Sequence, residues 1–98
     1  MREGGVIATV KVRLPALLAT YAGGQRDYTV EAATVGEALT AARDALPGLR
    51  RLLEDERGHR RPHVKVFYNE ADEESIEDPG SPASDRDEIM IIQAVSGG

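Results

Sequence analysis

The strand predicted over residues 88–93 constrains the fold more than any other stretch, because it is apolar on both faces. Side chains alternate along a strand, so Ile89 and Ile91 face one way while Met90 and Ile92 face the other. A strand of this kind usually lies in the centre of a sheet and is covered on both sides. The chain has a single long helical pattern, which can cover only one of these faces. A partner protein is the simplest cover for the other face.

The long helical pattern begins at a predicted capping box, in which Thr34 is the N-cap and Glu37 reaches back to it. Apolar residues then recur at helical spacing, and Pro47-Gly48 ends the helix. These apolar positions are Val35, Ala38, Leu39, Ala42 and Leu46. Because they form one stripe, we expect the helix to pack against a sheet. One or two further helical turns are expected over residues 49–53.

Three further segments, residues 6–14, 25–31 and 63–68, alternate apolar and polar side chains as half-buried strands do. Ser75 and Ile76 are interpreted as a very short strand, and residues 85–87 as a polar turn into the last strand. Strands interrupted by a single long helix indicate an α+β fold, in which one sheet packs on one main helix.

Charge and composition exclude several classes of function. The formal net charge of −5 argues against nucleic acid or an anionic membrane as the main partner. The chain has no cysteine, and therefore no disulfide, thiolate metal site or cysteine nucleophile. Neither a signal peptide nor a membrane-spanning run is evident, so we expect a cytoplasmic protein. The acidity is uneven, because residues 70–88 hold nine acidic residues and one base.

We expect no metal site in this chain. His59 and His63 have the spacing of a helical ligand pair, but Pro62 between them opposes a helix. The acidic residues within 70–74 lack the glycine and the ordered ligand spacing of a calcium loop. A solvated acidic surface is the better interpretation of that segment.

Three stretches carry a resemblance to a known family. Residues 64–69 are a strand that ends in Asn, residues 85–89 are a turn into the last strand, and residues 94–98 end the chain in Gly-Gly. Together they resemble the MoaD/ThiS family of ubiquitin-like sulfur carriers. Two positions depart from the family pattern. Arg86 stands where a turn glycine is usual, and Gln93 where a proline is common in the small subunits of molybdopterin synthase.

The CysO-type carriers are the branch that the chain resembles most, through Gly23-Gly24-Gln25, Pro47-Gly48-Leu49 and its overall length. The resemblance implies a β-grasp, ubiquitin-like fold. In that fold a mixed sheet packs on one main helix, and the first and last strands are adjacent and parallel. The resemblance also implies a single domain over residues 1–98, of which residues 93–98 are an exposed and flexible C-terminal tail.

The resemblance further implies a sulfur carrier, which is a protein co-substrate and not an enzyme. An E1-like adenylating enzyme that uses ATP and Mg²⁺ would activate the carboxylate of Gly98. The resulting thiocarboxylate would give sulfur to a synthase that makes cysteine, a cofactor or a thio-natural product. This chemistry needs no catalytic side chain and no bound cofactor from the chain. Val95, Ser96 and Gly97 lead to Gly98, and the two glycines lack Cβ atoms, so they suit a narrow slot.

Phe67, Met90 and Ile92 are the predicted partner-binding residues. Val64 and Val66 are expected to face the helix, so Phe67 faces away. The β-grasp strand order then places Phe67 beside Met90 and Ile92. We expect the three to form an exposed apolar patch at the root of the tail, where the activating enzyme binds.

Two alternatives stay open at this point. One is a ubiquitin-like modifier, whose Gly98 is joined to a target lysine. The other is the small subunit of molybdopterin synthase. The pathway, the sulfur acceptor and the oligomeric state also stay open.

Overall fold

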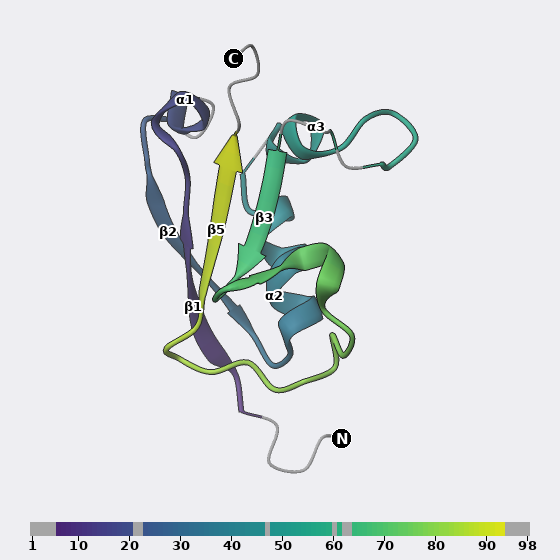
Figure 1. Ribbon diagram of the computed structural model, residues 1–98. Coiled ribbons are helices and arrows are strands. Elements are labelled where there is room, and N and C mark those ends of the chain that lie inside the picture. Colours follow the sequence, from purple (N-terminus) through teal and green to yellow (C-terminus); the bar gives the residue numbers. More distant parts are fainter. Residues whose placement is uncertain (1–5, 21–22, 47, 60, 62–63, 94–98) are drawn as a thin grey trace.

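A five-stranded mixed sheet packs against one main helix in the structure, a computed structural model that describes residues 6–20, 23–46, 48–59, 61 and 64–93 (Figure 1). In chain order the elements are β1 (Ala8–Arg13), α1 (Ala16–Ala19), β2 (Asp27–Ala32), α2 (Val35–Asp44), α3 (Leu49–Leu53), β3 (Val64–Tyr68), β4 (Ala71–Asp72), the 3₁₀ turn η2 (Glu73–Ser75) and β5 (Glu88–Gln93). In the part of the chain that is described, no helix has both the length and the apolar composition to cross a membrane.

The parallel pair of β1 and β5 forms the centre of the sheet, whose strand order is β2-β1-β5-β3-β4. Val12 is the partner of Ile89 in this pair, and the other neighbouring strands are antiparallel. A parallel pair needs a long crossover connection, and the chain between β1 and β5 includes the main helix, α2. The predicted β-grasp, an α+β fold with adjacent and parallel first and last strands, is confirmed.

The start of α2 forms the predicted cap, with one difference. The Glu37 amide donates to Thr34 Oγ1 at 3.2 Å, which makes Thr34 the N-cap. The Glu37 carboxylate accepts from the Ala33 amide at 2.9 Å, one residue earlier than a standard capping box. The local sequence therefore determines where this helix begins.

The loop before β5 docks on the start of α2. The Val35 amide donates to the Ser81 carbonyl at 2.9 Å, and the Gly36 amide donates to the Pro79 carbonyl at 2.8 Å. The first N–H groups of a helix have no partner within the helix, and these two bonds satisfy two of them. A Cβ on Gly36 would lie 3.2 Å from the Pro79 carbonyl oxygen, so glycine permits the close approach.

The core lies between one face of the sheet and the apolar stripe of α2. Alternate residues of β1, β3 and β5 are buried there, as their sequence patterns predicted. On the helix, Val35 and Leu39 are each 8% exposed. Leu46, the predicted last residue of the stripe, follows the helix and is partly buried against the core. Leu49 and Leu53 of α3 are buried at one end of the same core.

The prediction of a short strand at Ser75 and Ile76 is wrong. The return strand is β4, which directly follows a two-residue turn in which Asn69 has a φ of 57°. Asn tolerates this left-handed conformation, so the hairpin forms without the glycine that usually marks such a turn. Ser75 instead ends η2, whose N-cap Asp72 accepts from the Glu74 amide at 2.8 Å.

Most other boundaries differ from the predicted ones by one or two residues, which is ordinary for the ends of helices and strands. β1 lies within the predicted range of 6–14, and β2 begins two residues later than predicted. α2 ends at Asp44, and β5 has the predicted bounds of 88–93.

Two substitutions on β5 test its division into a core face and an outer face, because Ile89 is 0% exposed and Ile92 is 40% exposed. Ile89→Ala should lower the free energy of unfolding by about 3 kcal/mol, through lost burial and the cavity left behind. Ile92→Ala should lower it by less than about 1 kcal/mol, as a largely exposed substitution does. Urea unfolding followed by circular dichroism measures both. Equal losses would contradict the two-faced arrangement.

Candidate functional site

The end of the sheet at which β5 finishes is the candidate site, and we call it the tail end. Gln93, the last residue of β5, is the partner of Val64 at the start of β3. α1 and α3 lie at this same end of the sheet (Figure 1). The four predicted tail residues lie outside the described residues, so their roles stay predictions. These residues are Val95, Ser96, Gly97 and Gly98.

The three predicted partner-binding residues lie together on the face of the sheet that α2 does not cover. Phe67 of β3 is directly opposite Met90 of β5. Ile92 follows Met90 on the same face, opposite Lys65. Phe67 and Met90 are half-buried, and Ile92 is 40% exposed. The fold thus groups Phe67, Met90 and Ile92 into one apolar cluster, the outer-face patch. Only Ile92 has the predicted exposure, and the role of the patch in binding stays a prediction.

Charged side chains flank the outer-face patch and pair with one another. Arg13 Nε lies 3.1 Å from Asp27 Oδ1 and 3.5 Å from Glu88 Oε2. On the β4 side, Lys65 Nζ lies 3.6 Å from Asp72 Oδ2. An apolar centre inside a polar rim is the usual anatomy of a protein interface.

A partly buried ion-pair network joins three elements, α2, α3 and η2. The Arg43 side chain is 10% exposed, with its Nε 3.0 Å from Glu54 Oε2 and its Nη2 2.7 Å from Glu73 Oε2. Burial alone would lower the pKa of Arg43, but the hydrogen bonds and charges of Glu73 and Glu54 outweigh it and raise that pKa. Arg43 thus ties α2 to η2 and to the residue that ends α3. No local spacing in the sequence signals this network, because Glu73 is 30 positions from Arg43.

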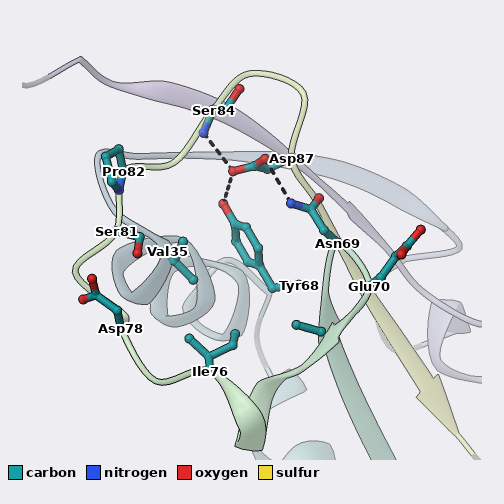
Figure 2. A pocket seen from close by; sticks show the side chains of 11 residues that line it. Val35, Tyr68, Asn69, Glu70, Ile76, Asp78, Ser81, Pro82, Ser84 and Asp87 are labelled. Carbon is teal, nitrogen blue, oxygen red and sulfur yellow. Dashed lines mark hydrogen bonds between the residues drawn. The ribbon is translucent and has the colours of Figure 1, made fainter.

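An open pocket at the opposite end of the sheet, the far end, is built around Asp87 (Figure 2). The Tyr68 hydroxyl donates to Asp87 Oδ2 at 2.6 Å, and the Ser84 backbone amide donates to the same oxygen at 2.8 Å. The Asn69 side-chain amide donates to Asp87 Oδ1 at 3.1 Å. Asn69 Oδ1 in turn accepts from the Glu88 amide at 3.0 Å. These bonds tie the turn before β5 to the end of β3, which is a structural role.

The Asp87 network shifts the pKa of both its acidic members. Burial raises the pKa of Tyr68 well above its ordinary value, and the hydrogen bond to Asp87 adds to that effect. Burial alone would raise the pKa of Asp87 as well. Hydrogen bonds from Tyr68, Asn69 and the Ser84 amide outweigh it, so the pKa of Asp87 is lower than usual. The carboxylate is therefore ionised at neutral pH and acts as a fixed acceptor.

Metal-binding side chains do not gather anywhere within the described ranges, where no three histidine or acidic residues form a possible ligand group. His59 is exposed, and its Nδ1 lies 4.0 Å from Asp55 Oδ2. His63, the other candidate of the sequence analysis, lies outside the described residues.

The sequence and the fold both have counterparts among known proteins. The model of the ThiS family matches residues 12–98 of this chain. No curated protein matches it in sequence. Among solved structures, the small archaeal modifier protein 1 (SAMP1) of Haloferax volcanii is 31% identical, with a TM-score of 0.71. That match covers 93% of this chain and 100% of SAMP1.

Two further matches come from protein complexes. A chain of the BexX/CysO complex of Amycolatopsis orientalis is 28% identical, with a TM-score of 0.68, over 91% of this chain and 99% of that one. A chain from the complex of subunits 1 and 2 of the Helicobacter pylori molybdopterin-converting factor is 21% identical, with a TM-score of 0.56, over 92% of this chain and 99% of that one. This last likeness shows the fold alone.

The pH dependence of stability tests the Asp87 network. Because the folded-state pKa of Asp87 is lowered, its stabilising effect is present above the ordinary carboxyl pKa of about 4 and is lost as the pH falls through the folded value. Asp87→Asn should therefore lower the free energy of unfolding by about 2 kcal/mol at pH 7 and by much less near pH 3. Urea unfolding at both pH values measures this. Glu70→Gln, an exposed change of the same charge at the same end, is the control, and an equal pH dependence in both variants would contradict the assignment.

Proposed function

This chain belongs to the ThiS family, and we propose that it is a sulfur carrier whose Gly98 carboxylate is adenylated by a separate enzyme and then converted to a thiocarboxylate. Small ubiquitin-like proteins of this kind are sulfur carriers or modifiers, and such proteins are generally not enzymes themselves. The observation that carries the proposal is the family match, which extends to Gly98 on a β-grasp fold.

The proposed chemistry occurs on the main-chain carboxylate and needs no side chain of the carrier. The Gly98 carboxylate attacks the α-phosphate of ATP, pyrophosphate leaves, and an acyl adenylate forms. Hydrosulfide then attacks the acyl carbon and AMP leaves, which gives the thiocarboxylate with no change of oxidation state. Mg²⁺ and the cationic groups of the adenylating enzyme stabilise the charge on the phosphates. Because the sulfur is carried on the C-terminal carboxylate, the carrier needs no cysteine thiol, and the chain has no cysteine.

The folded domain fixes the position of the residue from which the tail starts. β5 is paired with β1 as far as Met90 and with β3 as far as Gln93, so pairing with β3 holds the strand to its last residue. Five residues follow Gln93, and a fully extended segment of that length spans at most about 18 Å. We infer that this length lets Gly98 enter an active site recessed in a partner while the folded domain stays at its surface.

We propose that the adenylating enzyme covers the outer-face patch. The patch lies partly on β5, so a protein that accepts the tail meets Ile92 next to the tail root and Met90 two residues further back on the same face. Two of the structures that this chain resembles are protein complexes, which supports partner binding by proteins of this kind. The enzyme that accepts the sulfur is the proposed second partner.

A ubiquitin-like modifier is the second candidate function. It is favoured by the 31% identity to SAMP1, a protein named as a modifier. Both functions begin with the same acyl adenylate. They differ in whether a sulfur nucleophile or a lysine amine then attacks the Gly98 carbonyl carbon.

Intact-mass spectrometry tests the leading proposal. With the host adenylating enzyme, ATP, Mg²⁺ and a sulfide source, the mass of the chain should rise by the difference between sulfur and oxygen. Deletion of Gly98 should abolish this gain and leave the thermal unfolding midpoint unchanged. Gly97→Val should also fail, because a branched side chain cannot pass a slot shaped for glycine. Sulfur transfer by the truncated chain would refute the proposal, and isopeptide adducts without a thiocarboxylate would favour the modifier.

Steady-state adenylation kinetics test the outer-face patch. Phe67→Ala and Ile92→Asp should each raise the KM for the carrier about tenfold with little change in kcat, as expected when uniform binding is lost. Ile7→Asp is the matched control, because Ile7 is 53% exposed and directly precedes β1, whose start lies toward the far end. Unchanged KM in both patch variants, or an equal rise in the control, would rule the patch out as the docking surface.

A further inference from the structure

Acidic and basic side chains are unevenly distributed between two segments of the chain, although Arg43 and Lys65 of one segment pair with Glu73 and Asp72 of the other. Residues 70–88, gathered toward the far end, hold nine acidic residues and one base. Residues 43–65, which lead from α2 through α3 to the tail end, hold seven bases and four acidic residues. The proposed chemistry of Gly98 uses none of these charges, so their uneven distribution calls for a separate physical explanation.

Two arginines lie beside the root of the tail, and we call them the arginine pair: Arg51 and Arg61. The Arg61 carbonyl accepts from the Val64 amide at 3.2 Å, and Val64 is the partner of Gln93. Arg61 Nε donates to the Arg51 carbonyl at 2.8 Å, which holds the Arg61 guanidinium against α3. Both side chains are exposed. The Arg61 side chain is therefore held close to the point where β5 ends, beside Arg51.

Glu54, Asp55 and Glu56 line the same open pocket as the arginine pair, and the first two have other hydrogen-bond partners. Glu54 binds Arg43 at 3.0 Å and Arg50 at 3.3 Å. Asp55 accepts from two backbone amides of its own loop, at 2.8 and 3.0 Å. Among the residues that the structure describes, no carboxylate lies within ion-pair distance of the arginine pair. The backbone hydrogen bond from His59 does most to lower the pKa of Asp55 and the charge of Arg61 contributes, so Arg61 has a carboxylate nearby but no direct ion pair, and its guanidinium can still bind a partner.

We propose that the arginine pair docks on a carboxylate-rich surface of the adenylating enzyme, beside the entrance that admits the tail. This inference rests on the proposed function and adds the chemistry of the partner surface. The planar guanidinium group matches the geometry of a carboxylate and forms bidentate hydrogen bonds with it. The same acidic surface repels the acidic far end of the carrier. The carrier therefore approaches the enzyme with its tail end toward the enzyme surface.

The length of the tail favours an acidic protein surface over the phosphates of ATP. Adenylation takes place at Gly98, five residues beyond Gln93. When the tail is extended in its slot, the nucleotide lies about 18 Å from the tail root. An arginine side chain at the root cannot span that distance, so the arginine pair contacts the surface of the enzyme around the slot.

Charge reversal at either end of the sheet tests the inference with matched variants. Arg61→Glu and Arg86→Glu change the net charge equally, and Arg86 is exposed in the turn at the far end. With the adenylating enzyme that modifies the wild-type chain, Arg61→Glu should raise the KM about tenfold at low ionic strength and leave kcat unchanged. Screening by about 0.5 M salt should reduce this difference to about twofold. Arg86→Glu should change the KM by less than about twofold at either salt concentration.

Three results would overturn the inference. They are an unchanged KM for Arg61→Glu, an equal change in both variants, or a change that salt does not reduce. Each leaves the proposed function standing as long as the wild-type chain is adenylated. Thermal unfolding of both variants, with midpoints expected to equal that of the wild type, excludes misfolding as the cause.

A titration without any enzyme tests the same surface independently. When the ¹⁵N-labelled chain is titrated with a hexaglutamate peptide, the amide signals of Arg51 and Arg61 should shift most. Arg61→Glu should reduce those shifts, and Arg86→Glu should not. Larger shifts elsewhere, or tighter binding of a single-stranded oligonucleotide at the arginine pair, would contradict an acidic protein surface as the occupant.

Discussion

The parallel pairing of β1 with β5 is the interaction on which the rest of the structure depends. It places β5 between β1 and β3, so both edges of the strand are hydrogen-bonded and its side chains must alternate between the two faces. Ile89 and Ile91 enter the core beneath α2, and Met90 and Ile92 lie on the opposite face. A single strand therefore anchors the core, supplies part of the outer-face patch and leads into the tail.

Two polar networks tie the elements of the domain together, and one of them lies at the start of this central strand. At the far end, Asp87 accepts three hydrogen bonds and fixes the turn from which β5 starts. In the other network, Arg43 joins α2 to η2 and to the end of α3. Both networks are satisfied internally and have structural roles. This agrees with the proposed function, in which the reactive group is the main-chain carboxylate of Gly98 and the adenylating enzyme supplies the catalytic groups.

Local patterns were enough to predict the parts of the fold that depend on neighbours in the sequence. The capping residues Thr34 and Glu37 predicted the start of α2, and the apolar alternation of residues 88–93 predicted both the bounds and the two faces of β5. The same reasoning missed β4, because its hairpin turns on Asn69 in a left-handed conformation that leaves no glycine in the sequence. It also missed the networks of Arg43 and Asp87, whose partners lie far away in the chain.

The sequence by itself determined the α+β class, the main helix, the two-sided last strand and the family resemblance that singles out Gly98, because periodicity, capping and short motifs are local properties. The tertiary structure decided which residues became neighbours. Only the strand order brings Phe67 opposite Met90, and only the fold sets the arginine pair beside the root of the tail with the acidic loops at the far end. These contacts join residues distant in sequence, and their formation depends on the pairing of whole strands, which no single segment encodes.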